Sequence, residues 1–143
     1  MDDIGDASNV VTPKREMLGI FLLKTGAMFA NIPTRQIVAF SIRVPISNYF
    51  HILLKHARAF EKYRYYSFMV GYSFFVKKSI IDISVGPSYP VGGKFHGVEP
   101  VWFSVTDIAY HYRVSQNVVF SATMGSILVI APNSLSVGIG LAI

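Results

Sequence analysis

The chain has 143 residues, of which 52% are hydrophobic and only 15% are charged. This length fits a single domain, and the high apolar content excludes a chain that is disordered over most of its length. The net charge of +5 permits contact with nucleic acid or anionic lipid without requiring either. The absence of cysteine excludes disulfides, thiolate metal sites and cysteine nucleophiles. An aromatic content of 14%, with 7 Pro and 11 Gly, favours an all-β class of strands joined by turns.

The chain begins with a polar segment that shows no periodicity. Residues 1–12 carry three Asp together with Ser, Asn and Gly, and this acidic start differs from the basic start of a signal peptide. We therefore predict a flexible N-terminal arm over residues 1–12 and a single β-domain over residues 13–143.

The first two predicted strands differ in pattern. Met17–Phe29 is apolar, but its short length and its two Gly favour a strand over a helix. Gln36–Val44 alternates, with Val38, Phe40, Ile42 and Val44 on one face, and Pro45 ends it. We interpret Gln36–Val44 as a half-buried strand.

The period then changes in Ser47–Lys62. Phe50, Leu53, Leu54, Ala57 and Phe60 recur at helical spacing, while most of the charged residues fall on the other side. The pattern predicts one amphipathic helix between the second and third strands.

Period-two alternation returns in Tyr63–Val76 and continues to the end of the chain. Further strands are predicted at Ser79–Val85, Val101–Ala109, Val118–Thr123, Ile127–Ile130 and Leu135–Ile143. In Leu135–Ile143 one face is large and apolar and the other consists of Ser, Gly and Ala. Such a small face suits close approach by another element, a second subunit or the lumen of a barrel.

The sequence offers no convincing catalytic, metal or cofactor site. His51 and His56 would lie about 140° apart on a helix of 3.6 residues per turn, so they could not share one metal. His111, Ser115 and either Asp82 or Asp107 could be assembled into a hydrolytic triad, but no Gly-x-Ser-x-Gly elbow accompanies them. We therefore expect no enzymatic activity, no metal and no cofactor.

Basic residues form the candidate binding surface. Two follow the arm and four surround the end of the predicted helix, where they could neutralise phosphates without reading a base sequence. An ordinary solvated helix face is the alternative interpretation. The candidate nucleic-acid-binding residues are Lys14, Arg15, Lys55, Arg58, Lys62 and Arg64.

The order strand, helix, strand over Gln36–Val76, with the segment from Ala57 to Tyr72, resembles the middle of single jelly-roll coat proteins of small icosahedral RNA viruses. In that family a short helix fills the connection, and a run of the type aromatic, x, lysine, tyrosine, arginine leads into the next strand. The resemblance covers about 40 residues clearly and the rest by strand number. The acidic start departs from the arginine-rich arm of such proteins.

The resemblance implies an eight-stranded jelly-roll sandwich with one short helix. It also implies a structural capsid subunit of the virion that self-assembles in many copies and contacts viral RNA through phosphates. Its partners would then be copies of itself and the genome, with no small-molecule substrate.

Two alternatives remain open. An outer-membrane β-barrel is favoured by the 30 residues without charge from Val114 to Ile143 and by the alternation of the last strand. Its aromatic girdles would come from Tyr65, Tyr66, Tyr72, Phe74, Phe75, Tyr110 and Tyr112. The predicted helix and the lack of a signal peptide argue against it. A soluble ligand-binding β-sandwich is the third possibility.

Overall fold

The computed structural model describes residues 19–28, 35–59, 63–91, 103–127 and 134–143. These residues form eight strands and, within the described ranges, no helix. The strands are β1 (Ile20–Met28), β2 (Arg35–Pro45), β3 (Phe50–Ala59), β4 (Tyr63–Val76), β5 (Ser79–Val91), β6 (Phe103–Arg113), β7 (Val118–Ile127) and β8 (Ser134–Ala142). The predicted arm lies outside the described residues.

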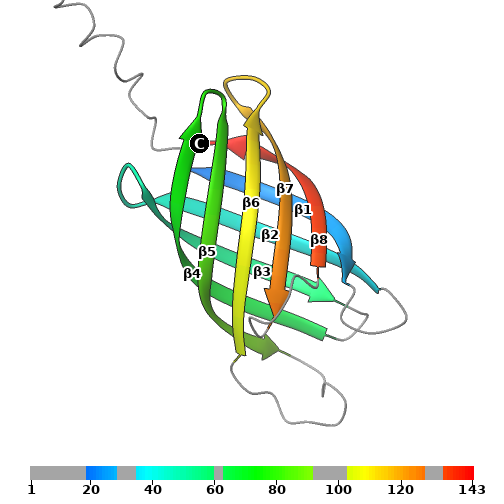
Figure 1. Cartoon of the computed structure of the whole chain (residues 1–143). Coiled ribbons are helices and arrows are strands. Elements are labelled where there is room, and N and C mark those ends of the chain that lie inside the picture. The colour runs from blue at the N-terminus through cyan, green and yellow to red at the C-terminus, as the bar shows by residue number, and fades with distance from the viewer. Residues whose placement is uncertain (1–18, 29–34, 60–62, 92–102, 128–133) are drawn as a thin grey trace, which may run out of the picture.

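The strands form one closed antiparallel barrel in which each strand pairs with its neighbours in the sequence (Figure 1). The barrel closes between β1 and β8, whose register runs from Ile20 opposite Ala142 to Met28 opposite Ser134. Because the sheet has no free edge, the strands satisfy their backbone groups within the barrel. No helix in the described part of the chain is long and apolar enough to cross a membrane.

Three short turns lie at one end of the barrel, which we call the turn end. They comprise residues 46–49, 77–78 and 114–117, and the backbone N–H of Ile143 donates to Gly19 at the same end. In the first turn, Ser47 Oγ accepts from the backbone N–H of Phe50 at 3.2 Å. Lys77 adopts a positive φ of 53°, which a two-residue hairpin turn requires. The opposite end is called the loop end.

The alternation of side chains is inverted relative to a soluble protein. On β4, Tyr66, Phe68 and Val70 point outward and are exposed, whereas Tyr65, Ser67 and Met69 point inward and are buried. The same rule holds around the barrel, so that large apolar side chains cover the outside while most buried polar residues face the lumen. A soluble domain does not present an apolar surface of this extent to water.

The predicted jelly-roll sandwich is therefore wrong, although the all-β class is correct. A jelly roll divides its strands between two packed sheets, whereas here one sheet closes on itself through the pairing of β1 with β8. The alternation of Gln36–Val44 is confirmed. Its apolar face, however, points outward, and the face that carries Arg43 points inward.

The predicted helix over Ser47–Lys62 is also wrong, because its central part is strand β3. The apolar residues on the helical template come from both faces of this strand: Leu54 points outward, while Leu53 and Ala57 point inward. The helical interpretation assumed that Lys55 faces water. In the barrel Lys55 is buried in the lumen.

The described C-terminal residues form strands β6, β7 and β8. The predicted strand Val118–Thr123 is part of β7, which continues to Ile127 and within which Gly125 faces the lumen. Apart from Ile127, the predicted strand Ile127–Ile130 lies outside the described residues. Of the three settings proposed for the small face of the last strand, the barrel lumen is confirmed. The large residues of β8, such as Ile139, are exposed on the outside.

The aromatic residues proposed as girdles divide between the two faces. Tyr66, Tyr72, Phe74, Tyr110 and Tyr112 are exposed on the outside. Tyr65 is instead buried in the lumen, and Phe75 packs against a buried apolar cluster. Around the turn end, Tyr72 stacks on Tyr49 with ring centroids 5.7 Å apart.

Gly71 provides space for an inward histidine on the neighbouring strand. It lies directly opposite His51, and an added Cβ would be 2.4 Å from His51 Nε2 and 2.6 Å from the carbonyl oxygen of Ile83. We expect Gly71→Ala to lower the free energy of unfolding by about 1–3 kcal/mol, because it overpacks the lumen.

Urea titration of the chain folded in detergent micelles measures this change. Gly19→Ala is the matched control, since its Cβ would meet no atom closer than 3.6 Å. Equal stability of the two variants would contradict the close packing at Gly71.

Candidate functional site

The barrel lumen is the most chemically distinctive part of the molecule. Charged and polar side chains from all strands except β8 are buried there. Burial of a charge without a partner is energetically costly. The buried polar and charged residues are Lys24, Ser41, Arg43, His51, Lys55, Ser67, Ser73, Asp82, Ser84, Ser88, Asp107, His111, Ser121 and Thr123.

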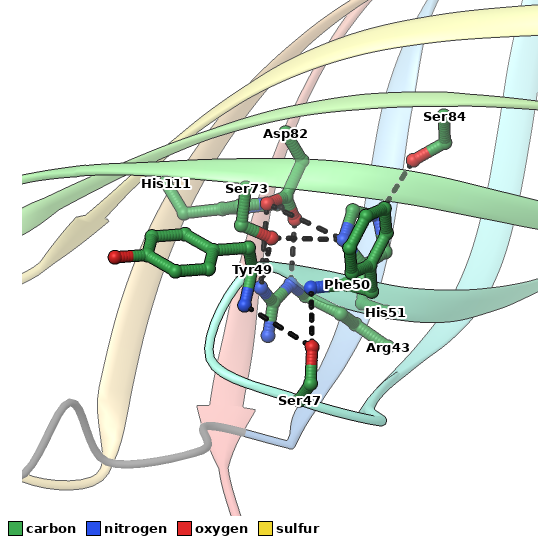
Figure 2. A network of polar contacts seen from close by, with 9 residues as sticks. All are labelled: Arg43, Ser47, Tyr49, Phe50, His51, Ser73, Asp82, Ser84 and His111. Atoms are coloured by element: carbon green, nitrogen blue, oxygen red, sulfur yellow. Dashed lines mark hydrogen bonds and ion pairs between the residues drawn. The ribbon is translucent and has the colours of Figure 1, made fainter.

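Asp82 is the centre of the larger polar network (Figure 2). Its Oδ2 accepts from Arg43 Nε at 2.6 Å and lies 3.1 Å from His111 Nε2, while its Oδ1 accepts from Arg43 Nη2 at 3.3 Å. Arg43, on β2, therefore reaches across the lumen to β5 and holds the carboxylate with Nε and Nη2 of its guanidinium group. A carboxylate bound in this fork is among the stronger polar contacts in proteins.

His51 extends this network on its other side. Its Nδ1 lies 2.9 Å from Ser73 Oγ and 3.7 Å from Asp82 Oδ1, and its Nε2 lies 2.7 Å from Ser84 Oγ. Ser73 Oγ in turn accepts from Arg43 Nη2 at 2.7 Å. Four strands, β2 to β5, are thus joined through one set of side-chain contacts, and β6 joins them through His111.

A second ion pair links opposite sides of the lumen. Lys55 Nζ, on β3, donates to both carboxylate oxygens of Asp107, on β6, at 2.8 and 3.1 Å. The ring of Tyr65 lies beside the ammonium group, with its centroid 5.9 Å away. The pair is shielded from water on both sides, since the side chains are 6% and 1% exposed.

Lys24 connects β1 with β7 across the small inner face of β8. Its Nζ donates to Thr123 Oγ1 at 2.8 Å. Gly138 lies opposite Lys24 on β8, and a Cβ there would be 2.8 Å from Lys24 Cγ. The side chain can pass over β8 only because this position has no side chain of its own.

Apolar side chains fill the lumen near the turn end. Ile20, Leu22, Ile80 and Val119 form a buried cluster, with Phe75 and Ala142 packed against it. A second cluster consists of Leu53, Met69 and Val105. The lumen of the described barrel is thus occupied by side chains, as expected for eight strands.

The predicted phosphate-contacting residues that the structure describes, Lys55, Arg58 and Arg64, do not all share one face of the barrel. Lys55 is buried in its ion pair with Asp107, while Arg58 and Arg64 are exposed and lie opposite each other on β3 and β4. Lys14, Arg15 and Lys62 lie outside the described residues. Of the three described candidates, Arg58 and Arg64 are the ones that come together.

The other candidate groups are separated as well. His51 points into the lumen and His56 points outward, because odd and even positions of a strand face opposite ways. His111 does contact Asp82, but Ser115 lies in the exposed turn after β6. The described residues contain no group of three His, Asp or Glu side chains placed to hold a metal ion.

Sequence reasoning missed the lumen network. Its signal is present in the sequence as isolated charged residues within apolar alternating segments, some of them on a face that also carries Ser residues. Arg43 shares its face of β2 with Ser41, and Asp82 shares its face of β5 with Ser84 and Ser88. Such a pattern indicates a lumen only when the other face is recognised as facing lipid.

Comparison with known proteins identifies the fold. Neither the known protein families nor the curated proteins contain a match to this sequence. Among solved structures, a de novo designed transmembrane β-barrel matches with a TM-score of 0.71 and 13% identity, covering 89% of this chain and 96% of its own. The N-terminal β-barrel domain of Pseudomonas aeruginosa OprF matches with a TM-score of 0.68 and 11% identity, covering 89% and 98%.

A third structure, the Yersinia pestis outer membrane protein Ail, has a TM-score of 0.57 and 11% identity, covering 87% of this chain and 99% of its own. These likenesses contradict the resemblance to viral coat proteins and, with it, the predicted capsid function, virion location and RNA partner. The chain has the fold of small transmembrane β-barrels.

Substitution of Lys55 and Asp107 tests whether the buried charges of the lumen depend on each other for stability. We expect Lys55→Met to destabilise the barrel by about 3–5 kcal/mol, because it leaves the carboxylate of Asp107 buried without its partner. The double variant Lys55→Met/Asp107→Leu should recover most of this loss, since no unpaired charge remains.

Urea unfolding of the single and double variants in the same micelles measures the coupling. Lys77→Met, in an exposed turn, is the control and should change the free energy of unfolding little. Additive effects of the two lumen substitutions would show that the residues do not depend on each other.

Proposed function

We propose that this chain is an outer-membrane-type β-barrel protein that spans a lipid bilayer as a plugged, non-enzymatic barrel. The observation that carries the proposal is the pairing of an apolar outward face with a polar, internally bonded lumen in one closed sheet. In hydrocarbon, closed barrels and helices are the structures that leave no backbone group without a partner.

The height of the outward apolar band supports this assignment. On β4 the outward residues from Val76 to Tyr66 are all aromatic or aliphatic, and Arg64 follows at the next outward position. Ten residue steps at about 3.3 Å, tilted by about 40°, correspond to about 25 Å across the membrane. This height equals the apolar band of outer-membrane barrels.

The polarity of the outward face supports it further. Among the strand residues whose side chains the structure describes, Arg58 and Arg64 are the charged residues that point outward. Exposed Tyr72, Tyr110 and Tyr112 lie toward the turn end, where the amphipathic rings suit a membrane interface.

A purely structural use of the lumen is favoured over catalysis. His51 lies within hydrogen-bonding distance of Ser73 and Ser84 and near Asp82, so components of a nucleophile and base are present. All four side chains are buried, and His51 contacts the other three, so neither serine oxygen is presented to a substrate at the barrel surface. The network holds strands together, and the filled lumen opposes free passage of solutes.

Refolding from urea into lipid vesicles tests the proposed function. We expect the chain to insert, to gain β-sheet circular dichroism and to become protected from added protease. A monomer that folds in buffer without detergent or lipid would refute membrane insertion and favour a soluble barrel.

A charge at the middle of the outward face should impair insertion. Ile139 is 61% exposed and lies opposite Leu23 near the middle of β1. We expect Ile139→Arg to reduce stability in vesicles by about 2–4 kcal/mol, because it places a guanidinium group in the hydrocarbon. Asn117→Arg, which adds the same charge in a turn, is the matched control. Equal stabilities in vesicles would contradict lipid contact at Ile139.

A further inference from the structure

The two outward arginines occupy a distinctive position at the loop end of the apolar band. Arg58 on β3 and Arg64 on β4 are direct cross-strand partners, and both are exposed. This register brings two positive charges together at one point on the outside of the barrel. Two guanidinium groups side by side are also well suited to bind the oxygens of a phosphate.

An apolar groove lies beside the arginines on the outside of β2 to β5. It has a volume of about 420 Å³ and is lined by residues that include Phe40, Leu54, Tyr66, Phe68 and Tyr89. Because the side chains of these residues belong to the outward face, the groove opens to the surroundings of the barrel. Lys55 and Ser67, whose side chains point inward, also line it. Its lining suits a hydrocarbon chain.

His56 lies between the arginines and the apolar part of the groove. It also lines the groove, and its ring centroid is 4.5 Å from that of Tyr66, its cross-strand partner. His56 Nδ1 is buried and has no hydrogen-bond partner in the described structure. A polar atom of this kind, in an otherwise apolar lining, indicates that a ligand with a hydrogen-bonding group completes the site.

The chemical order along the groove matches one class of molecule. Successive outward pairs on β3 and β4 are Arg58 with Arg64, His56 with Tyr66, and Leu54 with Phe68, spaced about 7 Å apart along the strands. This order runs from cationic through polar to apolar. An anionic phospholipid has the same order in its phosphate, its glycerol esters and its acyl chains.

We propose that this groove is a binding site for one anionic phospholipid, with the phosphate on Arg58 and Arg64, the ester region at His56 and an acyl chain over Leu54 and Phe68. The inference rests on the proposed membrane insertion, because a lipid reaches this face laterally from the bilayer. The phosphate lies at the border of the apolar band, which is the depth of lipid headgroups.

The test uses the full chain refolded into phosphatidylcholine nanodiscs that contain a minor fraction of phosphatidic acid. Native mass spectrometry after release into detergent counts the lipids that each barrel retains. We expect one retained phosphatidic acid, and at least about a tenfold loss of its apparent affinity in Arg58→Gln/Arg64→Gln, because both phosphate contacts are removed.

Lys77→Gln/Lys78→Gln is the matched control, since it removes two exposed charges from the turn end and leaves the same net charge as the arginine variant. It should retain the lipid as the unmodified chain does. Equal losses in the two double variants would overturn the proposal, because they would indicate attraction by overall charge. Retention of phosphatidylcholine and phosphatidic acid in equal amounts would overturn it as well.

A groove variant separates a lipid site from a free phosphate site. Leu54→Trp fills the apolar part of the groove and keeps both arginines, so it should weaken retention of phosphatidic acid. Unchanged retention in this variant, or displacement of the lipid by inorganic phosphate alone, would overturn the assignment of a lipid. Protease protection in vesicles is measured for every variant first. Insertion without lipid retention would therefore refute this inference alone, whereas failure of the unmodified chain to insert would refute the proposed function.

Discussion

The pairing of β1 with β8 is the constraint on which the rest of the structure depends. It closes the sheet and removes both free edges. It also separates an inner face, which buries polar side chains, from an outer face, which exposes apolar ones. The small inner face of β8 serves this closure, because Gly138 and Gly140 let Lys24 and Leu22 of β1 lie over the last strand. Through Gly138 the side chain of Lys24 reaches Thr123 on β7, so the junction is held by side chains as well as by the backbone.

Once the sheet is closed, the inward charges must bind one another. Asp82 accepts from Arg43 and contacts His111, and Asp107 accepts from Lys55, so each buried carboxylate has a cationic partner on a different strand. A buried ion pair adds little net stability compared with apolar packing, whereas loss of one partner is costly. We infer that these pairs mainly specify the strand register. The outward face of the described strands is mainly apolar. Its charged residues, Arg58 and Arg64, lie together at the border of the apolar band, where we propose that a lipid phosphate binds.

The sequence predicts most of the strands but not which face of each strand points into the barrel. The alternation of Gln36–Val44 and Tyr63–Val76 is sufficient to identify two strands, because period two is a local property. It does not reveal which face meets water. Strand β3 was mistaken for a helix because His51 and Lys55 point inward, opposite to the rule for soluble proteins. The pairing of Lys55 with Asp107 joins residues 52 positions apart, and no local pattern indicates it.

Site-directed spin labelling on β7 tests the inverted polarity most directly. The chain contains no cysteine, so single cysteines at residues 119–124 can each carry one label in vesicles. Collision with dissolved oxygen, which concentrates in the bilayer, should be frequent at Phe120, Ala122 and Met124 and rare at Ser121 and Thr123, while a water-soluble nickel complex should reach none of them. Frequent collision of the nickel complex with labels at Phe120 and Met124 would contradict the account, because it would place the apolar face in water.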